Sequence, residues 1–204
     1  GTTEAFQKLA ENAPAFHEKP NQSGGEPTSL MPHPILTRSL AEITPQPVDW
    51  LWAGYIPFGM VTLLIGDPGV GKGTLCTDLV ARLTTGRAMP LLEQEREPLS
   101  ALLMVSAEDD LARTISPRYT AAGADLQLVH AIEKVLSLPN DLPEIESEVR
   151  RHQARLVIID PLNAYLNGRI DGHKDQDIRR ALSPLKEMAE RTGAAVILVH
   201  HLNK

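Results

Sequence analysis

This chain of 204 residues has few aromatic residues, a single cysteine and no net positive charge. Aromatics make up 4% of the sequence, so any core must be built mainly from aliphatic side chains. The single cysteine, Cys76, cannot form an internal disulfide, which fits a reducing compartment. The formal charge of −6 argues against a general basic surface that coats nucleic acid. No apolar stretch approaches the roughly 18 residues of a membrane span, and no secretory signal begins the chain. We therefore expect a soluble, cytoplasmic protein.

A glycine-rich segment directly follows the apolar run from Met60 to Ile65. This order predicts a buried strand, a tight turn and then a helix. Glycines let the backbone wrap around phosphate groups with its N–H groups pointing inward, and Lys72 adds positive charge at the β and γ oxygens. The helix that begins near Lys72 directs its positive end at the same anion. The residues predicted to bind the phosphates of ATP are Gly66, Asp67, Pro68, Gly69, Val70, Gly71, Lys72, Gly73 and Thr74.

One position of this loop differs from the usual pattern. The residue after the lysine is normally Ser or Thr, whose hydroxyl binds Mg²⁺, but here it is Gly73. The first hydroxyl belongs to Thr74, which helix geometry turns by about 100° from that position. Thr74 stays a candidate metal ligand. Our hypothesis is that water fills the missing ligand position and that Thr74 contacts the α-phosphate.

Proline is distributed unevenly along the chain. Residues 1–47 contain seven of the sixteen prolines, together with polar and glycine-rich stretches. Such a composition disfavours a packed core. We predict a flexible leader over residues 1–47, with a short helix near residues 3–13, and a folded part over residues 48–204.

Apolar runs alternate with amphipathic segments through the folded part. The predicted strands are 60–65, 99–105, 126–130, 156–159 and 194–199. The predicted helices are 75–83, 109–123 with a break near Pro117, 143–152, and 175–192, which Pro184 either kinks or divides. Strands that alternate with helices predict an α/β fold with a mainly parallel sheet and helices on both faces.

Polar residues follow four of these strands, at the sheet edge where open α/β folds bind ligands. Asp160 is predicted to hold Mg²⁺ or its water shell, although an aspartate before a proline is also ordinary in turns. Glu108 is predicted to deprotonate an attacking water, and its alternative role is to cap the next helix. His200 and His201 could each bond a γ-phosphate. Neighbouring strand residues point to opposite faces, so one of the two is expected in the site, and the sequence does not select which.

Taken in order, these motifs resemble those of the RecA-like ATPases. The resembling segments are the glycine-rich loop, Ser106-Ala-Glu-Asp109, Ile158-Ile-Asp-Pro161 and Val199-His-His-Leu-Asn-Lys204. The likeness covers about residues 48–204 and is closest to the RepA-type branch of hexameric replicative helicases and related plasmid and phage AAA-type ATPases.

The resemblance implies a set of ligands and roles. ATP and Mg²⁺ would bind, with Lys72 and Thr74 on phosphate, Glu108 as the base and Asp160 near the metal. A histidine of the pair 200–201 would sense hydrolysis, and subunits would form a homo-oligomeric ring such as a hexamer. Relatives continue with further strands and a finger residue from a neighbouring subunit, so the resemblance also implies a chain that is truncated at its C-terminus or minimal.

Residues 166–175 correspond to a loop that touches nucleic acid in the channel of RecA-like rings. Arg169 and Lys174 are therefore candidate contacts to single-stranded DNA. Acidic residues nearly cancel their charge, so a solvated loop is the alternative. The leading function is a DNA-dependent ATPase of helicase type.

Two other functions stay open at this stage. Adenylate kinases also have glycine after the loop lysine, which allows a nucleoside monophosphate kinase-like phosphotransferase. Against it, about 60 residues precede the loop here, and no arginine-rich lid is evident. Gly73 also allows a nucleotide-binding module that does not hydrolyse ATP, although such a module would not need Glu108 or Asp160.

Overall fold

The computed structural model describes residues 37–105, 109–134, 136–166 and 175–201. The predicted leader helix at residues 3–13 lies outside them. The strands are β1 (Trp50–Trp52), β2 (Ile56–Pro57), β3 (Val61–Gly66), β4 (Ser100–Val105), β5 (Val129–Ala131), β6 (Ala154–Asp160) and β7 (Ala195–His201). The α-helices are α2 (Lys72–Thr85), α3 (Ser116–Ala121), α4 (Leu142–Arg151) and α5 (Asp175–Thr192). Shorter helical turns cover Leu40–Glu42, Leu111–Ile115, Leu126–Leu128 and Leu162–Ala164.

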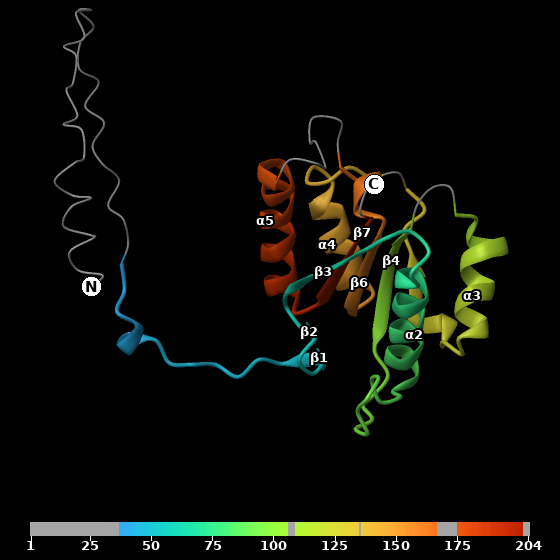
Figure 1. Cartoon of the computed structure of the whole chain (residues 1–204), viewed down its shortest axis with the longest axis horizontal. Coiled ribbons are helices and arrows are strands. Elements are labelled where there is room, and N and C mark those ends of the chain that lie inside the picture. Colours follow the sequence, from blue (N-terminus) through green and yellow to red (C-terminus); the bar gives the residue numbers. More distant parts are fainter. Residues whose placement is uncertain (1–36, 106–108, 135, 167–174, 202–204) are drawn as a thin grey trace, which may run out of the picture. The chain divides into compact units, whose positions relative to one another are not determined.

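The main sheet has five parallel strands in the order β3-β7-β6-β4-β5. The strand before the glycine-rich loop, β3, pairs directly with the last strand, β7, so that Gly66 is the register partner of His201. All carboxyl ends therefore meet at one edge of the sheet, near the top of Figure 1. The sequence correctly predicted the α/β class, the mainly parallel sheet and its flanking helices.

Alternate residues of the central strands build two separate cores. On β7, Val196 and Leu198 pack with α4 and α5, whereas Ile197 and Val199 pack with α2 and the α3 region. Figure 1 shows α4 and α5 on one side of the sheet and α2 and α3 on the other. This period of two follows from strand geometry, and it fixes the side of the sheet on which each residue at a strand end emerges.

A short antiparallel pair, β1 and β2, precedes the main sheet. The guanidinium of Arg155, at the start of β6, lies 4.4 Å from the centre of the Phe58 ring. Arg96 donates hydrogen bonds to the carbonyl oxygens of Trp50 and Leu51. These contacts tie the β1–β2 pair to the part of the chain that contains the sheet.

Two local predictions need correction. Residues 126–128 form a 3-10 turn and only Val129–Ala131 pair as a strand, because Asp125 caps the turn by accepting from the Gln127 N–H. Pro117 does not break a helix: it lies in the first turn of α3, after a π-helical turn, where its missing N–H is tolerated. Pro184 lies inside the continuous α5, which excludes the alternative of a divided helix and leaves that of a kink.

The chain separates into two compact units, residues 1–45 and 46–204. In the first, the described turn Leu40–Glu42 is capped by Ser39, whose hydroxyl accepts from the Ala41 N–H. The predicted division into a leader over 1–47 and a core over 48–204 stays a prediction. Among the residues that the structure describes, no helix has the length and hydrophobicity needed to cross a membrane.

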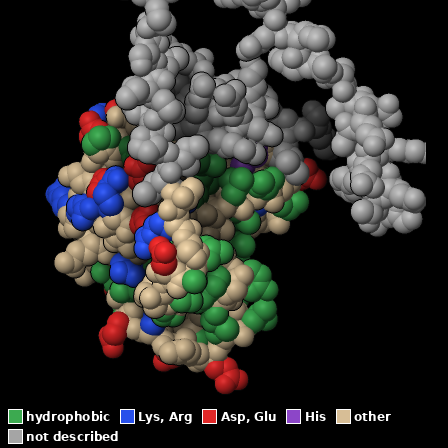
Figure 2. All heavy atoms as spheres, turned by 90° about the vertical axis from the view of Figure 1, so that its left-hand side faces the viewer, with side chains coloured by type: hydrophobic (Ala, Val, Ile, Leu, Met, Phe, Trp, Pro, Cys, Tyr) green, Lys and Arg blue, Asp and Glu red, His purple; other side chains and the backbone are tan. Residues whose placement is uncertain are grey.

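The surface of the second unit mixes charges of both signs. Figure 2 shows Lys and Arg side chains beside Asp and Glu, with hydrophobic side chains gathered on part of the same face. One of the charged clusters joins α4 and α5: Glu146 accepts from Arg150 at 2.7 Å and from Arg191 at 2.7 Å.

Candidate nucleotide-binding site

The glycine-rich loop connects β3 to α2 at the carboxyl edge of the sheet. Gly71 is the N-cap of α2 and has φ of 95°, a left-handed conformation that side chains other than glycine rarely adopt. The first N–H groups of α2 have no partner within the helix, and they face the loop together with the positive end of the helix dipole. The local sequence thus produces an anion-binding helix start of the kind used for phosphates.

Lys72 lies inside this loop and is only 7% exposed. Its ammonium donates to the carbonyl oxygens of Gly66 at 2.7 Å and Asp67 at 2.9 Å. Two of its three donor hydrogens are therefore used to hold the loop in shape, and one is left for a ligand oxygen. Pro68 and Val70 form the exposed outer rim of the loop.

A pocket of about 290 Å³ opens over the loop. From the predicted set it brings together Gly69, Gly71, Lys72, Gly73, Thr74 and His201. It also contains Arg118, which the sequence analysis did not single out. Arg118 is carried by α3, whose packing beside α2 is a tertiary contact, and no local motif marks it. Lys72 and Arg118 give the pocket two positive side chains, which suits a polyphosphate.

The two histidines emerge on different faces of β7. His201 continues the alternation of Ile197 and Val199 and lies in the pocket with the loop. His200 continues the alternation of Val196 and Leu198, toward α4 and α5. Both rings are half-buried, and neither Nδ1 atom has a hydrogen-bond partner within the described part of the chain. The geometry therefore selects His201 as the histidine that can reach a bound phosphate.

Asp160 ends β6 and faces the start of α2. Its Oδ2 lies 3.7 Å from the position that a Cβ would take on Gly73. The missing side chain at residue 73 therefore leaves open space beside a carboxylate. Carboxylate and hydroxyl oxygens are the protein ligands that Mg²⁺ prefers, often with several waters retained. Asp160 lies beside Gly73, and Thr74, the next residue, lines the pocket, so the two residue types fit such a hydrated ion.

Burial raises the pKa of Asp160, and the negative charge of Asp109 adds to the rise. The positive charges of His201, Arg118 and Lys72 oppose it. These influences place four charged or titratable side chains around Asp160. A cation bound beside the carboxylate would favour its ionised form.

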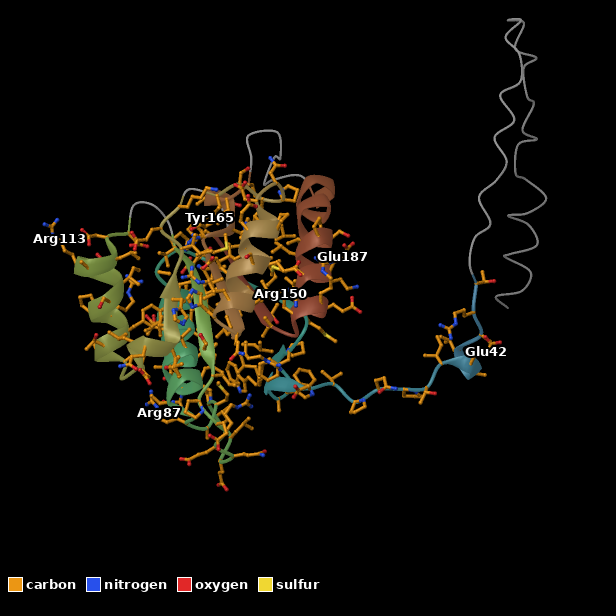
Figure 3. All side chains as sticks on the ribbon, turned by 180° about the vertical axis from the view of Figure 1, so that it is seen from behind. Glu42, Arg87, Arg113, Arg150, Tyr165 and Glu187 are labelled. Atoms are coloured by element: carbon orange, nitrogen blue, oxygen red, sulfur yellow. The ribbon has the colours of Figure 1, made fainter. Side chains whose placement is uncertain are left out.

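The turn after β6 is bonded to the end of a neighbouring strand. The Tyr165 hydroxyl donates to the carbonyl oxygen of Val105 at the end of β4, and burial raises the pKa of Tyr165 to about 12. Figure 3 shows Tyr165 near the same edge of the sheet. This bond links the end of β4 to the turn after Asp160. Glu108, Arg169 and Lys174 lie outside the described residues, so their predicted roles stay predictions.

A family model of the AAA domain matches residues 26–204. The chain belongs to the AAA domain family. This membership confirms the RecA-like P-loop ATPase class that the motifs resemble, whereas the RepA-type branch stays a prediction.

The chain is also similar to bacterial proteins named DNA repair protein RadA. The protein from Mycobacterium tuberculosis (strain H37Rv) is 29% identical over 156 residues, which cover 76% of this chain and 29% of the relative. The protein from Halalkalibacterium halodurans is 28% identical over 156 residues, covering 76% and 30%. The one from Streptococcus pneumoniae is 26% identical over 156 residues, covering 76% and 32%. The chain thus spans only about a third of the length of these curated relatives.

Proposed function

We propose that this chain is the ATP-hydrolysing core of a DNA-dependent ATPase of the helicase, repair or recombination type. One observation carries the proposal: Lys72, Arg118 and His201 line a single pocket over the phosphate loop. Asp160 faces the first turn of the helix that starts there. A pure phosphate-binding loop would need neither the carboxylate nor the histidine. The link to DNA comes from the RadA relatives, which are named DNA repair proteins.

The proposed chemistry assigns a role to each residue. Backbone N–H groups of the loop and the third Lys72 hydrogen bind the β and γ oxygens. Asp160 and Thr74 would hold Mg²⁺ or its waters, and a bound ion would supply positive charge beside the phosphates. Glu108 accepts a proton from a water whose oxygen bonds to the γ-phosphorus while the bond to the β-phosphate oxygen breaks. Arg118 stabilises the charge that spreads over the γ oxygens, and His201 bonds one of them.

The first experiment is product analysis with and without single-stranded DNA. We expect ADP and free phosphate, released faster when DNA is present. Transfer of phosphate to AMP would instead establish the kinase. Binding of ATP without turnover, in the oligomer and with DNA, would establish the non-hydrolysing module.

Arg118→Ala tests the residue that completes the pocket. Removing one charged group that contacts the transferred phosphoryl should lower turnover by roughly 100-fold, with a smaller change in ATP affinity. Arg113→Ala is the matched control, because Arg113 is 89% exposed on the preceding turn. Equal turnover in the two variants would remove Arg118 from the mechanism.

The ring and the DNA loop are tested separately. Oligomeric mass, measured with and without a non-hydrolysable ATP analogue, should show assembly into a ring such as a hexamer. Affinity for single-stranded DNA should fall steeply with salt and fall further in an Arg169→Ala, Lys174→Ala double variant. Affinity that ignores both salt and the double variant would exclude this loop as the contact.

A further inference from the structure

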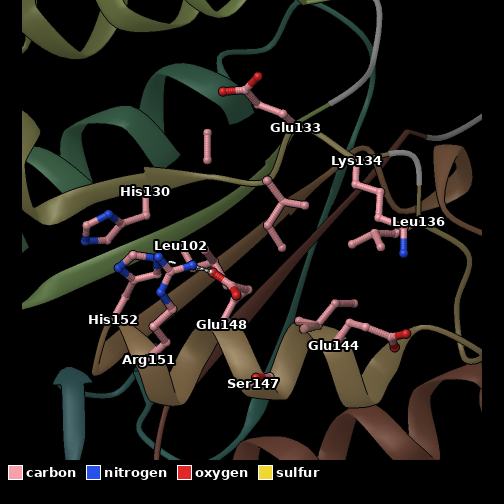
Figure 4. A pocket seen from close by; sticks show the side chains of 13 residues that line it. Leu102, His130, Glu133, Lys134, Leu136, Glu144, Ser147, Glu148, Arg151 and His152 are labelled. Carbon is pink, nitrogen blue, oxygen red and sulfur yellow. Dashed lines mark hydrogen bonds and ion pairs between the residues drawn. The ribbon is translucent and has the colours of Figure 1, made fainter.

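One cavity of the folded unit lies away from the phosphate loop, between α4 and the edge strand β5 (Figure 4). Its volume is about 670 Å³, and it shares no lining residue with the pocket over the loop. Leu102, Leu136 and Ile145 are part of its lining and are almost completely buried. Cavities that hold small organic molecules have roughly 300–1,000 Å³ and a mainly apolar lining with a few polar groups. This cavity has a volume in that range and an apolar floor, with eight polar or charged residues in its lining.

Four polar side chains gather at one end of the cavity, and Glu133, Lys134 and Glu144 line it elsewhere. The rings of His130 and His152 are stacked, with centres 3.8 Å apart and planes 19° from parallel. Glu148 accepts from Arg151 Nη1 at 3.3 Å, and its Oε2 also lies 3.3 Å from His152 Nε2. Figure 4 shows these four side chains side by side, His130 from β5 and the others from the end of α4. One carboxylate thus contacts one imidazole and one guanidinium.

We propose that this cavity binds a small anionic amphiphile, a molecule with an aromatic or alkyl body and a carboxylate, sulfonate or phosphate ester group. The body would lie on the apolar floor, and the anion would bond Arg151 and His152 at the polar end. Arg151 has five donor hydrogens and uses one on Glu148, so donors are available for a second anion.

The charge at the polar end supports this choice of ligand. Burial lowers the pKa of His130, and the positive charges of His152 and Arg151 lower it further against the opposing charge of Glu148. The groups that face His130 are Glu148, Arg151 and His152 from α4, with Glu133 and Lys134 in the segment after β5. Beside the ring, Arg151 and protonated His152 favour an anion, whereas Glu148 opposes it. Glu133 and Glu144 also line the cavity, so the anion would depend on the free donors of Arg151 and not on a net positive lining.

The test uses the full chain and 8-anilinonaphthalene-1-sulfonate, a fluorescent aromatic sulfonate. With the phosphate loop saturated by an ATP analogue, we expect saturable binding at one site. Ser147→Trp should weaken it about tenfold or more, because Ser147 is exposed on α4 at the cavity wall and a tryptophan would fill the space. Ser183→Trp, on an exposed position of α5, should leave it unchanged.

A second variant tests the anion contact without filling the cavity. Arg151→Gln should weaken binding about fivefold, the effect of losing one partly exposed ion pair, whereas Arg113→Gln should not. The proposal is overturned if binding is weaker than about 1 mM, or if Ser147→Trp and Ser183→Trp behave alike. It is also overturned if amide shifts map the probe to other elements, or if only an extended peptide along β5 binds.

Discussion

The two faces of the central sheet use the same strands for different purposes. On the α2 and α3 face, the strand ends deliver Asp160 and His201 to the phosphate loop. On the α4 and α5 face, the neighbouring residues continue an aliphatic core, and the helices are joined at the surface by Glu146 and its two arginines. A shift of one residue along β7 exchanges one environment for the other. Alternation along the strands therefore places the candidate site residues on one face of the sheet and the α4 and α5 core on the other.

The largest expected effect is on the α2 and α3 face. Lys72→Ala should lower ATP turnover by roughly 100-fold or more, because it removes a positive charge from the phosphate oxygens. Phosphate release measures this, and the melting temperature reports the fold. Lys186→Ala, on an exposed position of α5, is the control. Similar losses in both variants would contradict the division between the faces.

The two adjacent histidines of β7 give the sharpest test of this division between the two faces. His201→Ala should lower turnover about tenfold or more, the effect of losing one hydrogen bond to a charged group. His200→Ala should leave turnover within about twofold, because its ring emerges on the other face. Steady-state kinetics at saturating ATP compares the two. A larger loss in His200→Ala than in His201→Ala would mean that His200, and not His201, faces the pocket.

Gly73→Ser asks whether the open space beside Asp160 matters. A Cβ at this position would meet Asp160 Oδ2 at 3.7 Å, an ordinary contact, so the variant should fold. The new hydroxyl should replace a water near the metal and tighten Mg²⁺ binding to the nucleotide complex about fivefold. Calorimetric titration with Mg²⁺ measures it, and Gly73→Ala supplies the Cβ without the hydroxyl. Unchanged affinity and turnover in Gly73→Ser would end the hypothesis of a water in the missing ligand position.

The smallest effect is expected on the α4 and α5 face. Hydrogen bonds from Arg191 and Arg150 lower the pKa of Glu146 from 4.5 to about 2. Since the folded-state pKa is the lower one, the carboxylate stabilises the fold above pH 4.5, and this contribution is lost as the pH falls toward 2.

Water screens a cluster at the surface, so Glu146→Gln should lower the free energy of unfolding at pH 7 by about 1 kcal/mol. Urea unfolding across pH measures the change. Glu187→Gln, whose carboxylate is 65% exposed, should show almost none. A deficit in Glu146→Gln that persists unchanged at low pH would point to packing and not to charge.

The sequence predicted the sheet and the loop well because both depend on local patterns. The strand before the loop is an aliphatic run, and the loop is a set of residue types at fixed spacing, so neither needs knowledge of distant contacts. Alternation also predicted that only one histidine would enter the site. It could not say which, because that depends on which face α2 covers.

Arg118 and the short β5 show where local patterns stop. Arg118 enters the pocket through the packing of α3 beside α2, which no spacing in the sequence encodes. Residues 126–130 have the apolar character of a strand, yet the side chain of Asp125 bonds the Gln127 N–H and turns the first three residues away from the ladder. A tertiary contact decides the position of Arg118, and a capping hydrogen bond overrides the strand propensity of residues 126–128.

The pairing of Gly66 with His201 sets a limit on how the proposed ATPase could tell ATP from ADP. Adjacent strands keep a spacing of about 4.8 Å because every ladder bond would have to stretch for them to separate. The backbone distance between Gly66, at the start of the glycine-rich loop, and His201 is therefore fixed by the strand pairing. This distance would not shorten when a shorter phosphate chain is bound. In the proposed ATPase, a response to the lost phosphate would therefore have to come from another part of the pocket lining, such as Arg118 of α3.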